Sequence, residues 1–536
     1  MYRRLTINDR GQSQALIAPK RAGSILLLVL VVVAMMSLTV GSYLALMQNE
    51  HTATRYGGRR LQARLLVESG VEYLQAILSQ TEDEIERQGG LSDNSDLLQS
   101  ILVVEDTLSD FQGRFTVLVS AMENGLYDDL RYGIENESAK LNLNTLIEDD
   151  DDENDTARER LLAIPGIDSA MADAILDWLD EDDTPREFGV EQSHYQELSP
   201  SYQPRNGPLT ALDELLMVQG VTPELLYGFD TNRSYAVDAQ EQRARGALEE
   251  IDNNDGDMNR GISAYLTLHS LEELKTSGGE DKINVNGADL EQLYEALRKV
   301  TSEAGAKFIV AYRQNGPATK EATGEALDTA SLELDLKKEA TTEIASLFDL
   351  VDARVSVQVK KDKPVKMLNS PWKNAPTTYR NGFRDLLDHV QVDDSKQIAG
   401  RVNIDLASRP VLKSIPGMTE IVVDQILSQR VSESRGAEGE VRHPVWILAK
   451  GIVTLEEMKQ IAPYVTTGGD VFSAQVVGYF EGTSPRARAE VILDRTGEKP
   501  KIVSWQELSQ LGPGVDRRVL GDELDDELDG ELDAER

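Results

Sequence analysis

The chain has 536 residues, which is enough for more than one domain, and a formal net charge of −38. A surface this acidic opposes the binding of polyanions, so nucleic acid is not an expected partner. The sequence has no cysteine, which excludes disulfide bonds and thiol chemistry, and no two of its five histidines have a zinc-like spacing. It contains no P-loop, G-x-S-x-G or H-E-x-x-H motif, so we expect neither an enzyme nor a small-molecule substrate.

The N-terminus carries an apolar stretch, Ser24 to Met47, that contains no charged residue. A helix needs about 20 apolar residues to cross a bilayer, so this stretch is long enough for a single pass. The basic residues in front of it are Arg3, Arg4, Arg10, Lys20 and Arg21. Because basic residues favour the cytoplasmic side, we expect the N-terminus in the cytoplasm and the bulk of the chain exported.

Three interpretations of this N-terminus compete. A cleaved signal peptide has an apolar core of about 7–15 residues and a small-residue cleavage site, which the sequence after Met47 does not offer. A plain signal anchor stays open. The third interpretation is a type IV pilin-like leader, which the chain resembles in its basic residues, in Gly23, and in a helical pattern that continues to about Gln80. Gly57-Gly58 is a candidate point for a bend or break in that helix.

The pilin-like resemblance implies cleavage by a prepilin peptidase between Gly23 and Ser24, with Ser24 as the methylated first residue. Most pilin-like subunits then carry glutamate at the fifth position, where this chain has Leu28. In the family that glutamate pairs with the N-terminal amine of a neighbouring subunit, and a buried charge is tolerated only when paired. The absence of the carboxylate at Leu28 therefore predicts a place at the tip of a filament.

Strand-like runs occur near both ends of the exported part, at 115–119 and 130–134 and again at 471–480 and 489–493. Helical patterns dominate between them. We therefore expect an α+β fold with a pilin-like long N-terminal helix, a small antiparallel sheet, and a large inserted helical region of SAM-like or helix-hairpin-helix-like repeats.

The expected boundaries follow from these patterns. They are a prepilin leader (1–23), a transmembrane and long pilin-type helix (24–80), the first part of the sheet (81–140), a first SAM-like domain (141–235), a second (236–315), an insertion of unknown role (316–400), a third helix-hairpin-helix-like repeat (401–465), the C-terminal strands of the sheet (466–515), and an acidic disordered tail (516–536).

A three-fold theme runs through the insertion, at 141–145, 283–287 and 402–406. The first and third copies are followed by a matched hairpin, Ile164-Pro165-Gly166-Ile167 and Ile415-Pro416-Gly417-Met418. Proline and glycine between helical runs are typical of a tight turn between helices. The second copy lacks this Pro-Gly pair.

Helix-hairpin-helix motifs often bind the phosphate backbone, so a membrane-anchored DNA receptor is one alternative function. A DNA-binding hairpin usually offers a further glycine and nearby basic residues. Here Asp168 follows one hairpin and Thr419-Glu420 follows the other. Because these carboxylates would repel a phosphate, the hairpins are expected to pack helices and not to bind nucleic acid.

An ordered series of short sequences is similar to the K-type minor pseudopilin of type II secretion. The series comprises Asn142-Leu143-Asn144, Asp177 to Asp183, Gly189 with Glu191, Tyr195, Asn206 with Pro208, Leu209 to Leu215, Ala264 to Thr267, and Ile283 to Asn286. The similarity covers about residues 20–310 and, more loosely, the closing strands. Residues 316–400 and the third repeat exceed the usual length of the family.

This resemblance implies a single-pass protein of the inner membrane with its bulk in the periplasm. It implies a subunit that caps the tip of the periplasmic pseudopilus and helps to initiate its assembly, with other minor pseudopilins and the prepilin peptidase as partners. A minor pilin of a type IV pilus and the DNA receptor stay open as alternatives.

Two acidic segments are candidate metal sites. Asp177, Asp180, Asp182 and Asp183 crowd the end of an expected helix, and Glu191 follows in a turn-rich segment. Calcium takes six to eight oxygen ligands and suits such a cluster. The family binds calcium in this domain, and the resemblance carries the site over to Asp180, Asp182, Asp183 and Glu191.

The second candidate is a loop whose oxygen-bearing residues are Asp252, Asn254, Asp255 and Asp257. It resembles a calcium loop, although Gly256 is in the wrong register for an EF-hand.

Overall fold

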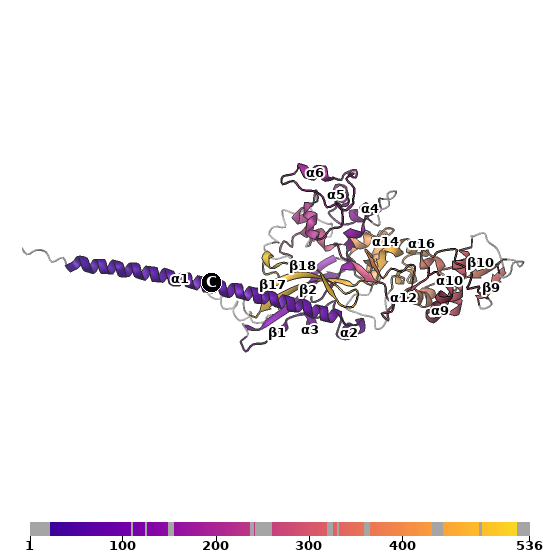
Figure 1. Ribbon diagram of the computed structural model, residues 1–536, viewed down its shortest axis with the longest axis horizontal. Coiled ribbons are helices and arrows are strands. Elements are labelled where there is room, and N and C mark those ends of the chain that lie inside the picture. The colour runs from indigo at the N-terminus through magenta and orange to yellow at the C-terminus, as the bar shows by residue number, and fades with distance from the viewer. Residues whose placement is uncertain are drawn as a thin grey trace, which may run out of the picture. The chain divides into compact units, whose positions relative to one another are not determined.

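Figure 1 shows the computed structural model of the chain. The structure describes residues 22–108, 111–123, 126–147, 155–235, 241, 260–318, 325–329, 332–358, 365–430, 443–481 and 485–521. The chain forms two compact units, Met1–Gln62 and Ala63–Arg536. We call the second unit the head.

One long helix, α1 (Ala22–Leu78), confirms the predicted N-terminal helix. It runs through Gly57-Gly58 without interruption, so a break at that point was a wrong expectation. Side chains from Ile25 to Met47 are exposed, and α1 is the one helix in the described part of the chain that is long and apolar enough to cross a membrane. From Ala63 onward the buried positions recur at helical spacing, which gives this end an apolar stripe for the head's core.

The head contains a seven-stranded sheet with the order β1-β2-β16-β17-β18, in which β3 pairs with β2 and β4 with β16. The pairs are antiparallel, as predicted. Its strands are β1 (Ile101–Val104), β2 (Gly113–Glu123), β3 (Leu126–Arg131), β4 (Glu135–Asn136), β16 (Val471–Phe480), β17 (Ala487–Asp494) and β18 (Lys501–Glu507). The two ends of the chain thus complete one sheet, with residues 137–470 inserted between β4 and β16.

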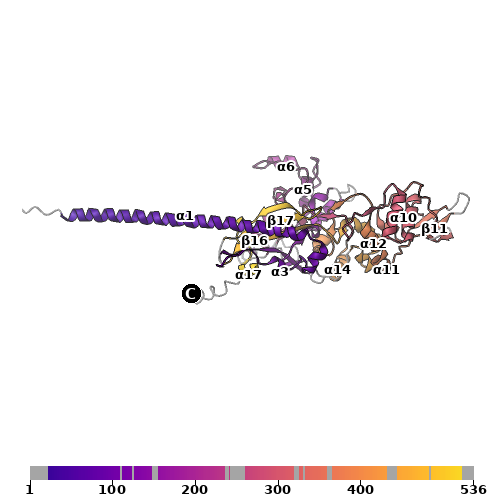
Figure 2. The same ribbon diagram turned by 60° about the horizontal axis from the view of Figure 1, so that its bottom comes forward.

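The C-terminal part of α1 packs on this sheet at close range (Figure 2). A Cβ at Gly478 would lie 2.3 Å from the carbonyl oxygen of Ala63, and one at Gly70 would lie 2.6 Å from Val476. Glycine on each partner therefore allows the helix and the sheet to approach. Short helices accompany the sheet: α2 (Glu82–Arg87), α3 (Ser95–Leu98) and α17 (Arg517–Leu520).

The insertion consists of three repeats that open and close in the same way. Each begins with a two-residue strand that pairs in parallel with a strand at the repeat's end: β5 (Leu141–Asn142) with β6 (Leu266–Thr267), β8 (Ile283–Asn284) with β12 (Val390–Gln391), and β14 (Val402–Asn403) with β15 (Val465–Thr466). In each opening strand an asparagine Oδ1 accepts the backbone N–H two residues on. The asparagines are Asn142, Asn284 and Asn403, at 3.0, 2.8 and 3.0 Å. The repeated motif is therefore an asparagine turn that starts each repeat.

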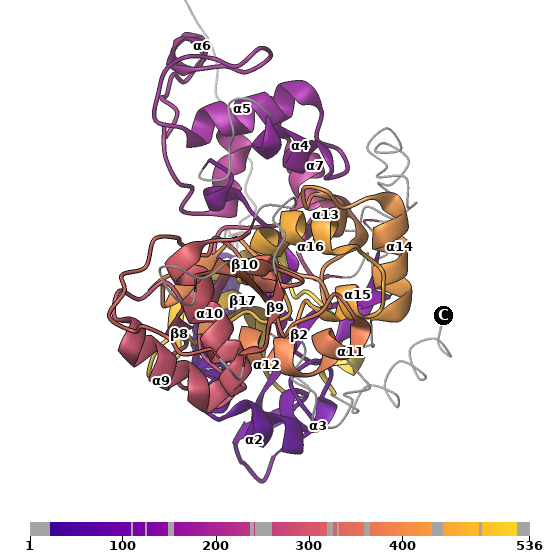
Figure 3. The ribbon, with the colours of Figure 1, turned by 90° about the vertical axis from the view of Figure 1, so that its right-hand side faces the viewer.

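The first repeat, 141–267, holds α4 (Thr156–Leu162), α5 (Ser169–Leu179), α6 (Gln192–Glu197) and α7 (Pro223–Tyr227). The second, 283–391, holds α9 (Leu290–Val300), α10 (Glu303–Asn315), α11 (Pro376–Arg380), α12 (Gly382–His389) and a small sheet of β9 (Glu325–Leu327), β10 (Arg354–Val357) and β11 (Lys366–Asn369). The third, 402–466, holds α13 (Arg409–Lys413), α14 (Glu420–Gln429), α15 (Trp446–Ala449) and α16 (Leu455–Ile461). Figure 3 shows α4, α5 and α6 of the first repeat at the top of the view, above the helices of the second and third repeats, which lie beside one another. Between repeats, β7 (Leu271–Glu273) pairs with β13 (Gln397–Ala399).

These closing strands correct two expected boundaries. The first repeat does not end at 235, because β6 at Leu266–Thr267 closes it. Residues 316–400 are not a separate insertion, because most of them complete the second repeat, with one hydrophobic core shared among the repeats. The predicted acidic tail lies mostly outside the described residues, since residues 522–536 are not described.

Buried ions join the start of the insertion to the sheet. Lys140, which is 5% exposed, lies 2.9 Å from Glu135 Oε2 and 2.8 Å from Glu137 Oε1. Ser473 of β16 donates its hydroxyl to Glu137 Oε1 at 2.6 Å. Burial alone would raise the pKa of Glu135, but Lys140 and Arg260 outweigh it and hold that pKa at about 2. The pair is therefore charged, and the network ties the start of the insertion to the sheet.

Candidate functional site

The N-terminal helix α1 contains the predicted processing and assembly residues. Gly23 and Ser24 lie in the first turn of α1, and their side chains are outside the described part. The basic leader, residues 1–21, is also outside it. Leu28 lies on α1 with its side chain 64% exposed, so it is open to a neighbouring helix or to lipid. Cleavage after Gly23 and an assembly role for Leu28 stay predictions.

Three carboxylates meet beside α5. The ligand atoms of Asp177, Asp180 and Glu191 all lie within 4.8 Å of one another. Asp177 is on the last turn of α5, Asp180 is its C-cap residue, and Glu191 is the N-cap residue of α6. The loop between the two helices thus returns Glu191 to the end of α5, and this makes an acidic cluster.

Packing around α5 explains this geometry. Every residue of α5 from Met171 to Leu179 is buried, including Asp173 and Asp177. The ring of Trp178 contacts that of Tyr195 edge-on at 5.1 Å, which links α5 to α6, and Trp178 Nε1 donates to Glu214 at 3.1 Å. A Cβ at Gly189 would lie 1.9 Å from Asp177 Oδ2. Only glycine at 189 therefore lets the returning loop pass over the Asp177 carboxylate.

Arg186 is the counter-ion of this cluster. Its backbone N–H donates to Asp177, and its Nη1 lies 3.1 Å from Asp177 Oδ1 and also pairs with Asp180. Burial, which outweighs these contacts, raises the pKa of both aspartates. For Glu191, the main contributions all raise the pKa. Burial first, and then the neighbouring aspartates, raise its pKa to about 7.

Several oxygens at this site are buried without a hydrogen-bond partner. They include both carboxylate oxygens of Glu191, Oδ1 of Asp180, and Oδ1 of Asn206, whose amide Nδ2 donates to the Asp182 carbonyl at 2.8 Å. Unpaired buried polar atoms are costly, and a cluster of them that are all acceptors suits a cation. A hard divalent ion such as calcium fits this set of oxygens.

The structure brings together two of the four carboxylates that were predicted as calcium ligands. Asp180 and Glu191 come together, but Asp182 and Asp183 have exposed side chains and bond instead to the Thr184 N–H and the Asn206 amide. The third carboxylate of the cluster is Asp177. It was not among the carried-over ligands, although its position one turn before Asp180 was a usable signal. The second candidate loop, with Asp252, Asn254, Asp255 and Asp257, lies outside the described residues.

The two hairpins are built alike. Gly166 and Gly417 have φ of 83° and 84°, and each is followed by the N-cap residue of the next helix. Asp168 Oδ1 accepts the Met171 N–H at 2.9 Å, and Thr419 Oγ1 accepts the Val422 N–H at 3.4 Å. Side chains of the protein therefore already occupy the helix N-termini that a phosphate would need, which argues against DNA binding at these hairpins.

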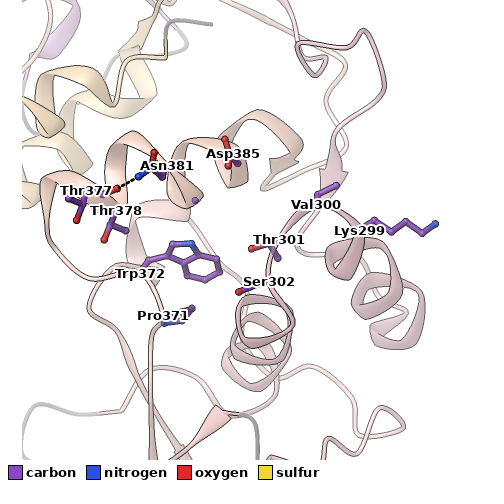
Figure 4. Close-up of a pocket in the computed structure, with 11 residues that line it drawn as sticks. Lys299, Val300, Thr301, Ser302, Pro371, Trp372, Thr377, Thr378, Asn381 and Asp385 are labelled. Carbon is purple, nitrogen blue, oxygen red and sulfur yellow. Dashed lines mark hydrogen bonds between the residues drawn. The ribbon is translucent and has the colours of Figure 1, made fainter. Parts of the chain in front are cut away.

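A cavity of about 600 Å³ lies in the second repeat, between the junction of α9 and α10 and the helices α11 and α12 (Figure 4). Hydroxyl side chains and the Trp372 ring line it, and the Asn381 amide donates to the Thr377 carbonyl at 3.1 Å. Its charged lining residues are Lys299 and Asp385, whose opposite charges balance each other. No sequence motif indicated this cavity.

Comparison with known proteins finds a similarity that covers most of the first repeat. Residues 139–228 match the sequence model of the type II secretion system (T2SS) protein K, first domain. No curated protein matches the chain. Among solved structures, the chain is similar to one in the crystal structure of the GspK-GspI-GspJ complex from the enterotoxigenic Escherichia coli type 2 secretion system, with 12% identity and a TM-score of 0.33 over 86% of this chain and 99% of that one.

The matched residues, 139–228, contain the asparagine turn, the first hairpin and the acidic cluster. They follow a helix that is long and apolar enough to cross a membrane and that packs on an antiparallel sheet. This part of the chain is therefore similar to the first domain of the type II secretion system protein K.

Proposed function

We propose that this subunit caps the tip of the periplasmic pseudopilus and helps to initiate its assembly. The observation that carries the proposal is Leu28, an exposed apolar residue at the fifth position after Gly23. A subunit inside a stack would place there a carboxylate that pairs with its neighbour's N-terminal amine. The first subunit has no neighbour ahead of it, so a carboxylate at that place would be left unpaired in apolar packing.

Other minor pseudopilins are the proposed partners, and the inner membrane and its prepilin peptidase are the proposed site and agent of maturation. The match to the protein K family supports the first of these, because a minor pseudopilin acts within an assembly of pseudopilins. The N-terminus would be cytoplasmic and the head periplasmic, and the subunit would act by assembly and not by catalysis.

The processing step is tested by N-terminal sequencing of the full chain extracted from membranes. We expect the mature chain to begin at Ser24, and Gly23→Leu to keep its leader. Gly41→Leu is the matched control, because Gly41 is also a glycine of α1, and a Cβ added to it would have no atom within 4 Å. An intact leader on the wild-type chain would leave only a signal anchor.

The tip position is tested by immunogold labelling of pseudopili that carry a tagged copy of this chain. We expect label at one end of each filament. Leu28→Glu should reduce the number of filaments, because its carboxylate has no partner, whereas Leu28→Ile should not. Label along the shaft would contradict the proposal.

We also infer that the acidic cluster holds calcium, through Asp177, Asp180 and Glu191. The unpaired buried oxygens carry this inference. The ion would offset two of the three carboxylate charges and fix the α5–α6 loop, and it would compete with Arg186 for Asp177 and Asp180. A bound ion stabilises the folded state, by about 2.7 kcal/mol at a hundred-fold excess over its Kd.

The measurement is thermal melting of the detergent-solubilised full chain with calcium and with chelator. Calcium should raise the melting temperature of the wild type and not that of Asp177→Asn. Asp424→Asn on α14 is the control and should behave as wild type, because Asp424 is an exposed partner of Arg409. Arg186→Ala should bind calcium more tightly. Melting that is indifferent to calcium would rule out the site.

A further inference from the structure

The first strand of the sheet has one unpaired long edge. β1 stands at the end of the sheet order and pairs with β2 alone. In the part of the chain that the structure describes, no strand adds to its outer side. Backbone N–H and C=O groups on that side are therefore available to a strand from another chain.

The side chains of β1 include no charged residue or proline that would prevent another strand from pairing with this edge. The strand reads Ile-Leu-Val-Val, and Leu102, Val103 and Val104 are 43%, 41% and 43% exposed. Apolar exposure continues at Leu108 and Phe111 in the turn that follows. Proteins usually protect edge strands with charges or proline, and β1 has neither. Its one protective feature is a bulge between Leu102 and Val104, which leaves Ile101 and Leu102 in regular register.

The opposite edge of the same sheet provides a contrast. β18 begins with Lys501 and ends with Glu507, and Ser504 and Gln506 lie between them. It has a bulge of its own and an exposed valine, Val503, at 44%. Both edges therefore have a bulge and exposed apolar side chains, which on β18 include Ile502, but β18 carries Lys501 and Glu507 whereas β1 has no charged residue.

The charge of the chain argues against a second copy as the occupant of β1. Two copies at −38 each would repel, and the exposed Glu105 and Asp106 directly follow the strand. An open backbone edge with an apolar surface and an acidic end fits an apolar strand that is flanked by neutral or basic residues.

We propose that the outer edge of β1 docks an edge strand of a neighbouring pseudopilin in the tip assembly, extending the sheet across the subunit boundary. This inference rests on the proposed function, because the proposed function supplies the neighbour. Apolar contacts from Leu102 and Val103 would accompany the backbone hydrogen bonds, and Glu105 and Asp106 would select against an acidic partner.

The test is site-specific photo-crosslinking of the full chain in its own membranes, with the other pseudopilins of the same system tagged. A benzophenone amino acid replaces Val103 on β1, Val503 on β18, or Leu61 on α1, which is 61% exposed. We expect adducts with a tagged pseudopilin from positions 103 and 61 and not from 503.

The outcomes separate this inference from the proposed function. An adduct from 61 without one from 103 overturns docking at β1 and leaves the assembly intact. Adducts from none of the three positions overturn both. A crosslink from 103 to a second copy of this chain, or equal adducts from 103 and 503, also overturns the inference.

A second arm uses identical charge substitutions at the two edges. Val103→Lys should weaken co-purification of the tagged pseudopilin by about tenfold or more, because a lysine would be buried at the junction. Val503→Lys should leave it unchanged. Both valines are partly exposed in the isolated chain, so both variants should melt as wild type, and equal binding by the two would refute the assignment.

Discussion

The first and third repeats place very different charge on a similar hairpin. Residues 141–267 hold 29 Asp and Glu against 8 Lys and Arg, whereas residues 402–466 hold 8 against 7. The turn glycines have nearly the same φ, 83° and 84°, and in both repeats a side chain caps the helix that follows. The hairpin scaffold is therefore independent of the acidic residues that the first repeat carries.

Counting from the N-cap residues Asp168 and Thr419 shows at which positions the two repeats differ in charge and burial. Asp173 and Asp424 occupy the same place, but Asp173 is buried and Asp424 is exposed beside Arg409. One turn later the first repeat has the buried Asp177 and the third has the exposed Ser428. The acidic cluster is thus a property of the first repeat's own sequence, and substitutions in the two repeats should separate scaffold effects from cluster effects.

The largest difference should be between Lys140, which directly precedes the first repeat, and a lysine of the third repeat. Lys140→Met would leave Glu135 and Glu137 buried without their shared counter-ion, at a cost of about 3–5 kcal/mol in the free energy of unfolding. Lys459 in the third repeat pairs with Asp349 at 3.1 Å, but both are partly exposed, so Lys459→Met should cost less than about 1 kcal/mol. Urea denaturation of the solubilised full chain measures both, and similar losses would contradict the buried network.

Glu191 should make the stability of the first repeat fall as the pH rises, whereas burial lowers the pKa of His443 in the third repeat to about 3, which acts in the opposite direction. In the absence of calcium the pKa of Glu191 in the folded chain is raised from 4.5 to about 7. Between these values the folded chain holds a proton that the unfolded chain has lost, so stability falls as the pH rises through this window. The loss is at most about 3 kcal/mol and is complete above pH 7.

Denaturation at pH 5 and pH 8 in chelator measures this effect, as the difference between wild type and Glu191→Gln. The glutamine variant should lose the dependence. Calcium should restore the stability of the wild type at pH 8, because the ion takes the place of the proton. The prediction would be wrong if the difference in free energy of unfolding between wild type and Glu191→Gln were the same at pH 5 and pH 8. Glu191 would then ionise in the folded chain without a loss of stability.

Substitution of Gly189, which lets the loop cross Asp177, should destabilise the chain more than substitution of a glycine with open space around it. Gly189→Ala places a methyl group on the Asp177 carboxylate and should cost about 1–3 kcal/mol and weaken calcium binding. Gly382→Ala in the second repeat is the control, since no atom lies within 4 Å of its added Cβ. Melting temperature and calcium titration report the two effects, and an unchanged Gly189→Ala would mean that the loop can move away from Asp177.

Elements whose pattern lies within a short stretch of sequence were predictable, whereas contacts between residues far apart in the chain were not. The long helix and the strands from both chain ends have local patterns of apolar residues, and both were predicted. The second repeat was divided wrongly because it lacks the Pro-Gly pair and is closed by a strand of two residues, Val390–Gln391, too short to leave a pattern. In the cluster, Asp180 and Glu191 were named as candidate ligands. Asp177 was noted only among the crowded aspartates, because its meeting with Glu191 depends on the return of the loop at Gly189, which lies far from it along the chain.

Alanine substitutions of the two hairpin glycines should give the smallest losses of stability, and the two losses should be nearly equal. An alanine at Gly166 or Gly417 would have to adopt a left-handed backbone, which costs about 1–2 kcal/mol in either repeat. Because the hairpins share their geometry, the two losses of melting temperature should agree within error, while calcium should raise both variants as it raises wild type. A much larger loss at Gly166 would mean that the first hairpin, and not only the α5–α6 loop, supports the acidic cluster.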